Sequence, residues 1–163
     1  MYYEDLEPYG IDAALSQAGK MALAVGWLES GFEYPRGPSD PQVIKRLFDF
    51  AKRRWWTGQL GYHSCDLCPS ASPYAATVVE WRRRTFLGLR RTLRCTTGDF
   101  EFFIPAHGCV YVAPSMILHY IMTHDYAPPR KFVDAVLSCP DVRTSAYATA
   151  VRDNGGAHLI SRG

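Results

Sequence analysis

The sequence predicts an α+β domain, in which a small antiparallel sheet has three to four helices packed on one face and a loop holds zinc. Two patterns predict this class: residues 77–112 are β-like in composition, and apolar residues recur at helical spacing after residue 114. Strands and helices thus come in separate runs, which favours α+β over an alternating α/β fold. With 47% hydrophobic and 21% charged residues, the 163 residues fit one globular domain, 1–163, with a frayed tail from about residue 154.

The first predicted elements are a strand and a helix. Residues 21–28 (MALAVGWL) are apolar and precede a stretch rich in Gly and Pro, which favours a buried strand. Ser39-Asp40-Pro41 then supplies an N-cap and a proline in the first turn of a helix. Apolar residues follow at helical spacing: Val43, Ile44, Leu47, Phe48 and Ala51.

A loop and a set of strands are predicted next. Residues 55–79 hold Gly, Cys, Pro and Ser in close succession, which predicts a loop around a cysteine pair. Within the β-like residues 77–112, Gly88 and Thr97-Gly98 separate the strands. Residues 100–104 alternate at period two, and residues 110–112 follow a turn at 105–108, so we expect a hairpin and an antiparallel sheet.

Helices complete the predicted fold. Ser115 is suited to cap a helix with an apolar stripe up to about residue 124. A proline pair at 128–129 opens a second helix, which Cys139-Pro140 ends. Residues 144–152 predict a last helix, and Asn-Gly-Gly at 154–156 begins the frayed tail.

Charge and cysteine content restrict the compartment and the class of partner. The formal net charge of +2 and the pI of about 8.3 do not by themselves require nucleic acid, so a basic surface must be sought locally. The N-terminus lacks the pattern of a secretory signal, and the apolar stretches are shorter than a membrane span, so no membrane role is expected. Five cysteines cannot all pair, which favours reduced thiols and a cytoplasmic location, with Cys95 and Cys139 in the core.

The most specific chemical pattern is the segment GYHSCDLCP at residues 61–69. Two thiolates separated by two residues, here Cys65 and Cys68, can bind one tetrahedral ion with each sulfur about 2.3 Å from zinc. The same spacing occurs in thiol–disulfide exchange, but Pro69 disfavours the helix that usually follows a redox pair. Zinc is therefore the preferred interpretation, with a redox pair and plain buried thiols as the alternatives.

Two histidines are candidates to complete the zinc site. His119 and His124 have the spacing used by zinc fingers, although residues five apart on a regular helix differ in direction by about 140°. Both can therefore bind one ion only if His124 lies past the end of the helix. The predicted ligands are Cys65, Cys68, His119 and His124, and the competing ligands are His63 and His107.

The predicted zinc is structural. Catalytic zinc keeps one position open for water and needs a nearby general base, and the sequence contains neither His-Glu-x-x-His nor the paired motifs of nucleobase deaminases. The alternative is a zinc-dependent hydrolase or related metalloenzyme, in which His63 or a helix histidine leaves a position for water. Asp66 or Glu101 would then serve as the base.

Six arginines fall within thirteen residues of the predicted strands. Along a strand, such charges form a stripe for phosphates or for the acidic surface of a protein. The alternative is a solvated outer face of the sheet, where arginines also discourage edge-to-edge association. The candidate partner-binding residues are Arg82, Arg83, Arg84, Arg90, Arg91 and Arg94.

Two longer segments carry a resemblance. They are GxHxCxxC at residues 61–68 and YVAPxMIxHYIxxHxYxPPxxF at residues 111–132. With these segments the chain resembles a family of small uncharacterised bacterial proteins that has no established activity, and the likeness extends up to Cys139. The resemblance implies that the cysteine pair, His119 and His124 belong to one site, which favours them over His107.

Taken together, these patterns predict a non-enzymatic, zinc-stabilised domain that binds a macromolecular partner. A protein is the favoured partner, as for immunity and adaptor proteins of this size. The alternatives are the zinc enzyme described above and nucleic-acid binding through the arginine stripe. The nucleic-acid alternative predicts an affinity that falls steeply with salt.

Overall fold

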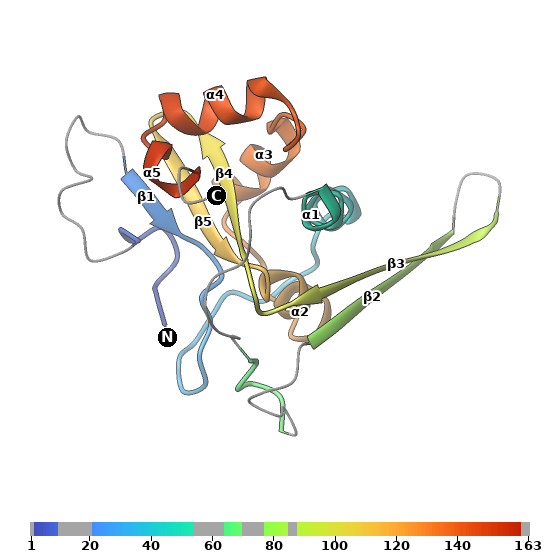
Figure 1. Cartoon of the computed structure of the whole chain (residues 1–163). Helices are drawn as coiled ribbons and strands as arrows, with labels where there is room; N and C mark the ends of the chain where they lie inside the picture. The colour runs from blue at the N-terminus through green and yellow to red at the C-terminus, as the bar shows by residue number, and fades with distance from the viewer. Residues whose placement is uncertain (1, 10–20, 54–63, 70–76, 85–87, 161–163) are drawn as a thin grey trace.

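The computed structural model describes residues 2–9, 21–53, 64–69, 77–84 and 88–160, and these residues form an α+β fold (Figure 1). The strands are β1 (Met21–Ala24), β2 (Thr77–Arg84), β3 (Arg90–Thr97), β4 (Glu101–Ala106) and β5 (Cys109–Pro114). The helices are α1 (Pro41–Arg53), α2 (Ile117–Thr123), α3 (Arg130–Ser138), α4 (Ser145–Asp153) and α5 (Ala157–Ile160). The predicted fold class is confirmed.

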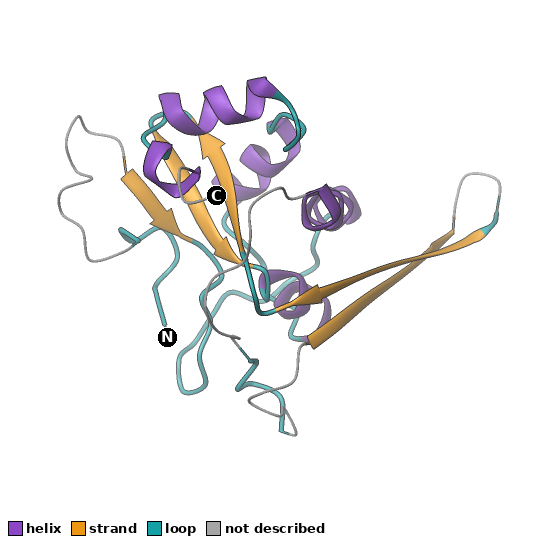
Figure 2. Ribbon diagram, viewed as in Figure 1, coloured by secondary structure: helices purple, strands orange, loops and turns teal. Residues whose placement is uncertain are grey.

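The strands belong to two sheets (Figure 2). β4 and β5 form the predicted antiparallel hairpin, and β1 extends this sheet in the order β1-β5-β4. β1 runs parallel to β5, with Met21 opposite Cys109, so this sheet is mixed where an antiparallel sheet was expected. A parallel pair needs a long connection, and α1 and the second hairpin, β2–β3, lie within it.

β1 is shorter than the strand predicted over residues 21–28. It ends at Ala24, because Gly26 adopts a φ of +72°, which an extended strand cannot contain. The chain nevertheless stays against the sheet, since the amide of Val25 donates to the carbonyl of Val112 at 3.1 Å. The indole nitrogen of Trp27 donates to the same carbonyl at 3.0 Å.

The three-stranded sheet is covered on both faces. Neighbouring residues of a strand point to opposite faces of a sheet. The contacts of Val110 and Tyr111 in β5 therefore show which elements pack on each face. The ring of Tyr111 contacts Phe132 of α3, with ring centroids 5.8 Å apart. On the other face, a Cβ at Gly156, just before α5, would stand 3.0 Å from the Cγ2 of Val110. Side chains therefore pack against both faces of this sheet.

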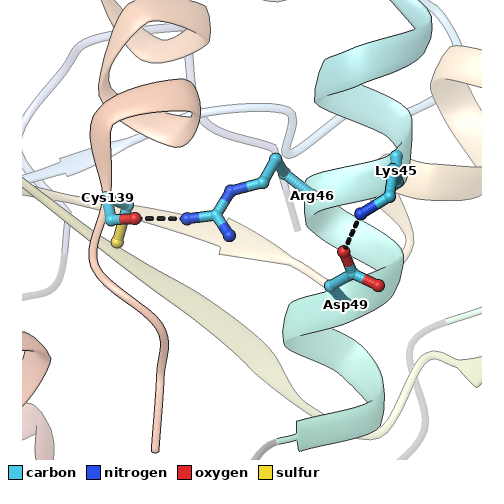
Figure 3. A network of polar contacts seen from close by, with 4 residues as sticks. All are labelled: Lys45, Arg46, Asp49 and Cys139. Atoms are coloured by element: carbon cyan, nitrogen blue, oxygen red, sulfur yellow. Dashed lines mark hydrogen bonds and ion pairs between the residues drawn. The ribbon is translucent and has the colours of Figure 1, made fainter. Parts of the chain in front are cut away.

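The first helix follows the sequence prediction closely. α1 begins at the predicted Pro41, and the Oδ1 of Asp40 accepts the amide of Gln42 at 2.7 Å. Figure 3 shows how α1 meets the end of α3: Arg46 donates from its guanidinium to the carbonyl of Cys139. Cys139 is itself 4% exposed, as expected for a core cysteine. Lys45 and Asp49 form an ion pair at 2.6 Å on the same helix (Figure 3).

Ser115 does not cap α2 with its side chain, contrary to the prediction. Met116 occupies the N-cap, without a side-chain cap, and α2 starts at Ile117. The hydroxyl of Ser115 instead accepts the amide of Gly98 at 2.7 Å. This contact ties the end of the β2–β3 hairpin to the start of α2.

Residues 154–160, the first part of the predicted tail, contact the sheet and contain a short helix. Asn154 accepts the amide of Gly108 at 2.9 Å through its side chain, which holds the segment to the turn between β4 and β5. Residues 157–160 then form α5, and Ile160 is 6% exposed. Four residues are too few to show helical periodicity, so the sequence pattern did not reveal this helix. Within the described residues, no helix has the length and apolar character of a membrane span.

Candidate metal centre

Four side chains from two separate parts of the chain converge at one point. They contribute one ligand atom each, and these four atoms lie within 4.8 Å of one another. The Nε2 of His124 lies 3.3 Å from the sulfurs of both Cys65 and Cys68, and 3.2 Å from the Nε2 of His119. The Nε2 of His119 is also 3.3 Å from the sulfur of Cys68. These four residues could hold one metal ion.

The local backbone explains how both histidines reach this point. His119 lies within α2, whereas His124 follows its last residue, Thr123, and has φ −113° and ψ 9°. The departure from helical geometry at His124 offsets the angle of about 140° that five helical positions would impose. The condition stated from the sequence, that His124 lies past the helix end, is therefore met.

The two cysteines come from a short segment without regular structure, residues 64–69, as predicted for the loop. Around one tetrahedral ion with zinc-like bond lengths, sulfur and nitrogen ligands stand about 3.3–3.8 Å apart. The measured separations of 3.2 and 3.3 Å are close to this range. The donor set and its spacing thus fit a tetrahedral ion.

Burial shifts the pKa values of two of the candidate ligands. Cys65 is 1% exposed and His119 8% exposed. Burial, together with the neighbouring thiol of Cys68, raises the pKa of Cys65 to about 11. Burial, with a smaller contribution from His124, lowers the pKa of His119 to about 4, so its imidazole is neutral at pH 7. A reactive redox cysteine needs a lowered pKa, so the environment of Cys65 does not favour the redox alternative.

Side chains around the four candidate ligands hold them in place. The Oγ1 of Thr123 lies 3.4 Å from the Nδ1 of His119, the ring nitrogen that faces away from the cluster. Such contacts orient the ring of a metal-binding histidine. Asp66, between the two cysteines, accepts the amide of Ser30 at 3.0 Å and so anchors the loop.

A third support lies just beyond His124. The hydroxyl of Tyr126 donates to both carboxylate oxygens of Asp5, at 2.8 and 2.9 Å. Asp5 also accepts the amide of Gly26 at 2.9 Å. Sequence reasoning missed Asp5 and Tyr126 as positioning residues, because separations of 121 and 21 residues carry no local signal. It also missed Thr123, although this residue lies only four positions from His119.

The other candidate site residues are placed differently. His107 is exposed in the turn between β4 and β5 and is not part of the cluster, so it does not compete as a ligand. His63 lies outside the described residues. Of the two possible bases, Asp66 is exposed, whereas Glu101 is 5% exposed in β4 and accepts the hydroxyl of Tyr9.

The arginines of the predicted stripe lie on the β2–β3 hairpin. The side chains of Arg82 and Arg94 are 81% and 66% exposed, and both pair with Glu80, at 3.7 and 2.7 Å. Arg90 and Arg91 are exposed on β3. In the register of the hairpin they stand opposite two further arginines, at positions 84 and 83.

Comparison with known proteins places the chain in a family. A family model described as a domain of unknown function, DUF7919, matches residues 1–137. The chain belongs to this family. The matched residues include all four members of the cluster, and the expected membership of an uncharacterised family is confirmed. No curated protein and no solved structure matches the chain.

Proposed function

We propose that this member of the DUF7919 family is a non-enzymatic domain stabilised by one structural zinc ion, and that it acts by binding a macromolecular partner. One observation carries the proposal: four ligand atoms, two sulfurs and two imidazole nitrogens, lie within 4.8 Å of one another. The thiols must stay reduced to bind the ion, so we place the domain in the cytoplasm.

The donor set supports zinc over the other common metals. Thiolate and imidazole ligands in a tetrahedral arrangement are typical of zinc, whereas magnesium and calcium take oxygen ligands. Binding would displace the protons of Cys65 and Cys68, because only thiolates bind the ion. The raised pKa of Cys65 therefore makes metal affinity fall as pH is lowered.

The same donor set supports a structural role. Four protein ligands complete a tetrahedral shell, so no position remains for the water that a hydrolytic zinc needs. The ion would also link the 64–69 loop to α2, segments that lie far apart in the sequence. A hydrolase would require one of the four ligands to leave the ion.

The first test measures metal content by native mass spectrometry and elemental analysis. We expect one zinc per chain, and none in the double variant Cys65→Ser, Cys68→Ser. The matched control is Cys95→Ser, Cys109→Ser, which removes two cysteines outside the cluster and should keep the zinc. Equal zinc content in all three proteins would refute the assignment of the ligands.

Cobalt substitution tests the structural role. In a closed site of four protein ligands, the absorption bands of bound cobalt do not change when anions are added. An open catalytic site would bind the anion and shift the bands, which would favour the zinc enzyme instead.

The partner proposed from the sequence is a protein. Placement of the arginines on a hairpin favours a second candidate, nucleic acid, because phosphates are the densest negative charges that such a hairpin could meet. The two candidates differ in a measurable way. Binding to phosphates weakens with salt in proportion to the number of contacts, whereas a protein interface with an apolar centre depends on salt far less.

A further inference from the structure

The β2–β3 hairpin is the feature of the molecule that the zinc site does not explain. Figure 1 shows its two strands, β2 and β3, extending away from the rest of the described chain. Residues 81–98 contain six arginines and no acidic residue. The whole chain has a formal net charge of only +2, so the remainder of the chain is net negative. Positive charge is therefore concentrated on this one projection.

Packing divides the hairpin into a supported base and a free outer part. At the base, Val79 and Leu93 are each 5% exposed, and the ring of Trp81 stacks on Phe48 of α1 at 6.3 Å. Beyond the base, residues 90–92 are all exposed, although consecutive residues of a strand point to opposite faces. Both faces of the outer part are thus open to solvent at these positions.

In the outer part, the register of the two strands places arginines opposite arginines. Like charges directly opposite on paired strands destabilise a hairpin, and here Arg91 and Arg90 stand opposite arginines 83 and 84. Among the described residues, the acidic partner on this hairpin is Glu80, which contacts Arg82 and Arg94 and lies nearer the base. A polyanion bound along the outer part would offset the like charges that this register brings together.

We propose that the outer part of the β2–β3 hairpin inserts into a groove of duplex DNA, with its arginines on the phosphates. The major groove of B-DNA admits a two-stranded β-ribbon, and duplex DNA carries one negative charge per about 1.7 Å of its axis. Arginine suits this role because its planar guanidinium binds phosphate through two parallel hydrogen bonds. An acidic protein offers lower charge density, and β3 contains none of the aromatic anchors that protein interfaces use.

This inference rests on the proposed function, because the hairpin is attached to the helix that carries one of the proposed zinc ligands. The hydroxyl of Thr97, at the end of β3, lies 3.3 Å from the sulfur of Met116, and Gly98 donates to Ser115. Both partners directly precede α2, which carries His119. Bound zinc would therefore hold α2 in place, and with it the end of the hairpin that contacts the start of α2.

The test measures binding to a mixed-sequence duplex of about 20 base pairs, two helical turns, by fluorescence anisotropy at several salt concentrations. For the intact protein we expect a log–log salt slope of about −4 to −5, as for five phosphate contacts. The variant Arg82→Gln, Arg90→Gln, Arg91→Gln should bind at least about tenfold more weakly, with a slope smaller by about 2 to 3. These side chains are exposed, so their replacement should leave the fold and the zinc content unchanged.

The matched control removes the same charge elsewhere. Arg130→Gln, Arg143→Gln, Arg152→Gln replaces three exposed arginines on or near α3 and α4 and should bind DNA as the intact protein does. Equal losses in the two triple variants would overturn the proposal, because net charge alone would then explain binding. Equal affinity for single-stranded DNA, or binding to polyglutamate without binding to the duplex, would overturn it as well.

Zinc content, measured on every sample, separates the two proposals. Protein that holds zinc but binds no duplex would refute the DNA inference and leave the structural zinc intact. Protein without zinc that still binds DNA through the hairpin arginines would refute the structural zinc and support the hairpin as the binding element.

Discussion

At the scale of single residues, Gly26 shows how the fold fixes the start of α2, the helix that carries His119. It adopts a φ of +72°, and a Cβ added there would stand 2.9 Å from two carbons of Ile117, the first residue of α2. We therefore expect Gly26→Ala to lower the free energy of unfolding by about 2–3 kcal/mol, through both backbone strain and this contact. Urea denaturation measures the loss.

Gly31→Ala is the control for the backbone strain at Gly26. Gly31 has a φ of +91°, yet nothing lies within 4 Å of the position that its Cβ would occupy. This substitution should cost about 1 kcal/mol, from backbone strain alone. If the two variants were equally destabilised, the contact with Ile117 would have no energetic role.

At the scale of elements, the zinc proposal makes α2 and the 64–69 loop depend on one ion. The loop has no regular structure of its own, and α2 spans seven residues, too few for a helix to be stable alone. Adding a chelator should therefore speed amide hydrogen exchange in these two segments first. β4 and α3 contribute no ligand to the cluster, so they should keep their protection for longer.

The double variant Cys65→Ser, Cys68→Ser is the control for hydrogen exchange. It should already exchange rapidly in the loop and in α2, and the chelator should change nothing further. A uniform acceleration across β4, α3 and α2 in the intact protein would contradict local dependence on the metal.

Elements with local signals were predictable from the sequence. The proline at position 41 marked the start of α1, and alternation at residues 100–104 marked β4, because caps and periodicity depend on neighbours in the chain. The parallel pairing of β1 with β5 was not predictable, since a strand pattern does not specify its partner. The cap assigned to Ser115 was wrong because its hydroxyl bonds to Gly98, seventeen residues away in sequence.

The cluster of two cysteines and two histidines could be predicted because few other roles bring these residue types together at this spacing. Cys65 and Cys68 have the spacing that binds one ion. His119 and His124 can join the same site because the helix ends between them. The surrounding contacts could not be predicted. Asp5 reaches Tyr126 across 121 positions, and its residue type does not point to this role.

At the scale of the whole molecule, the metal cluster, the arginine hairpin and the sheet form one connected arrangement. The family match over residues 1–137 contains all three, whereas α4 and α5 lie beyond it. α4 still joins the core, since the hydroxyl of Tyr147 donates to the carbonyl of Phe103 at 2.7 Å. Within the matched region, a bound zinc ion would thus connect to α2 through His119, and α2 would connect to the hairpin through Ser115 and Met116.

X-ray absorption at the zinc K-edge of the purified protein tests the central claim most directly, because it reports the atoms bound to the ion. The proposal predicts two sulfur ligands at about 2.3 Å and two nitrogen ligands at about 2.0–2.1 Å. A shell with an oxygen atom in place of one of these, or with a single sulfur, would contradict a structural site built from Cys65, Cys68, His119 and His124.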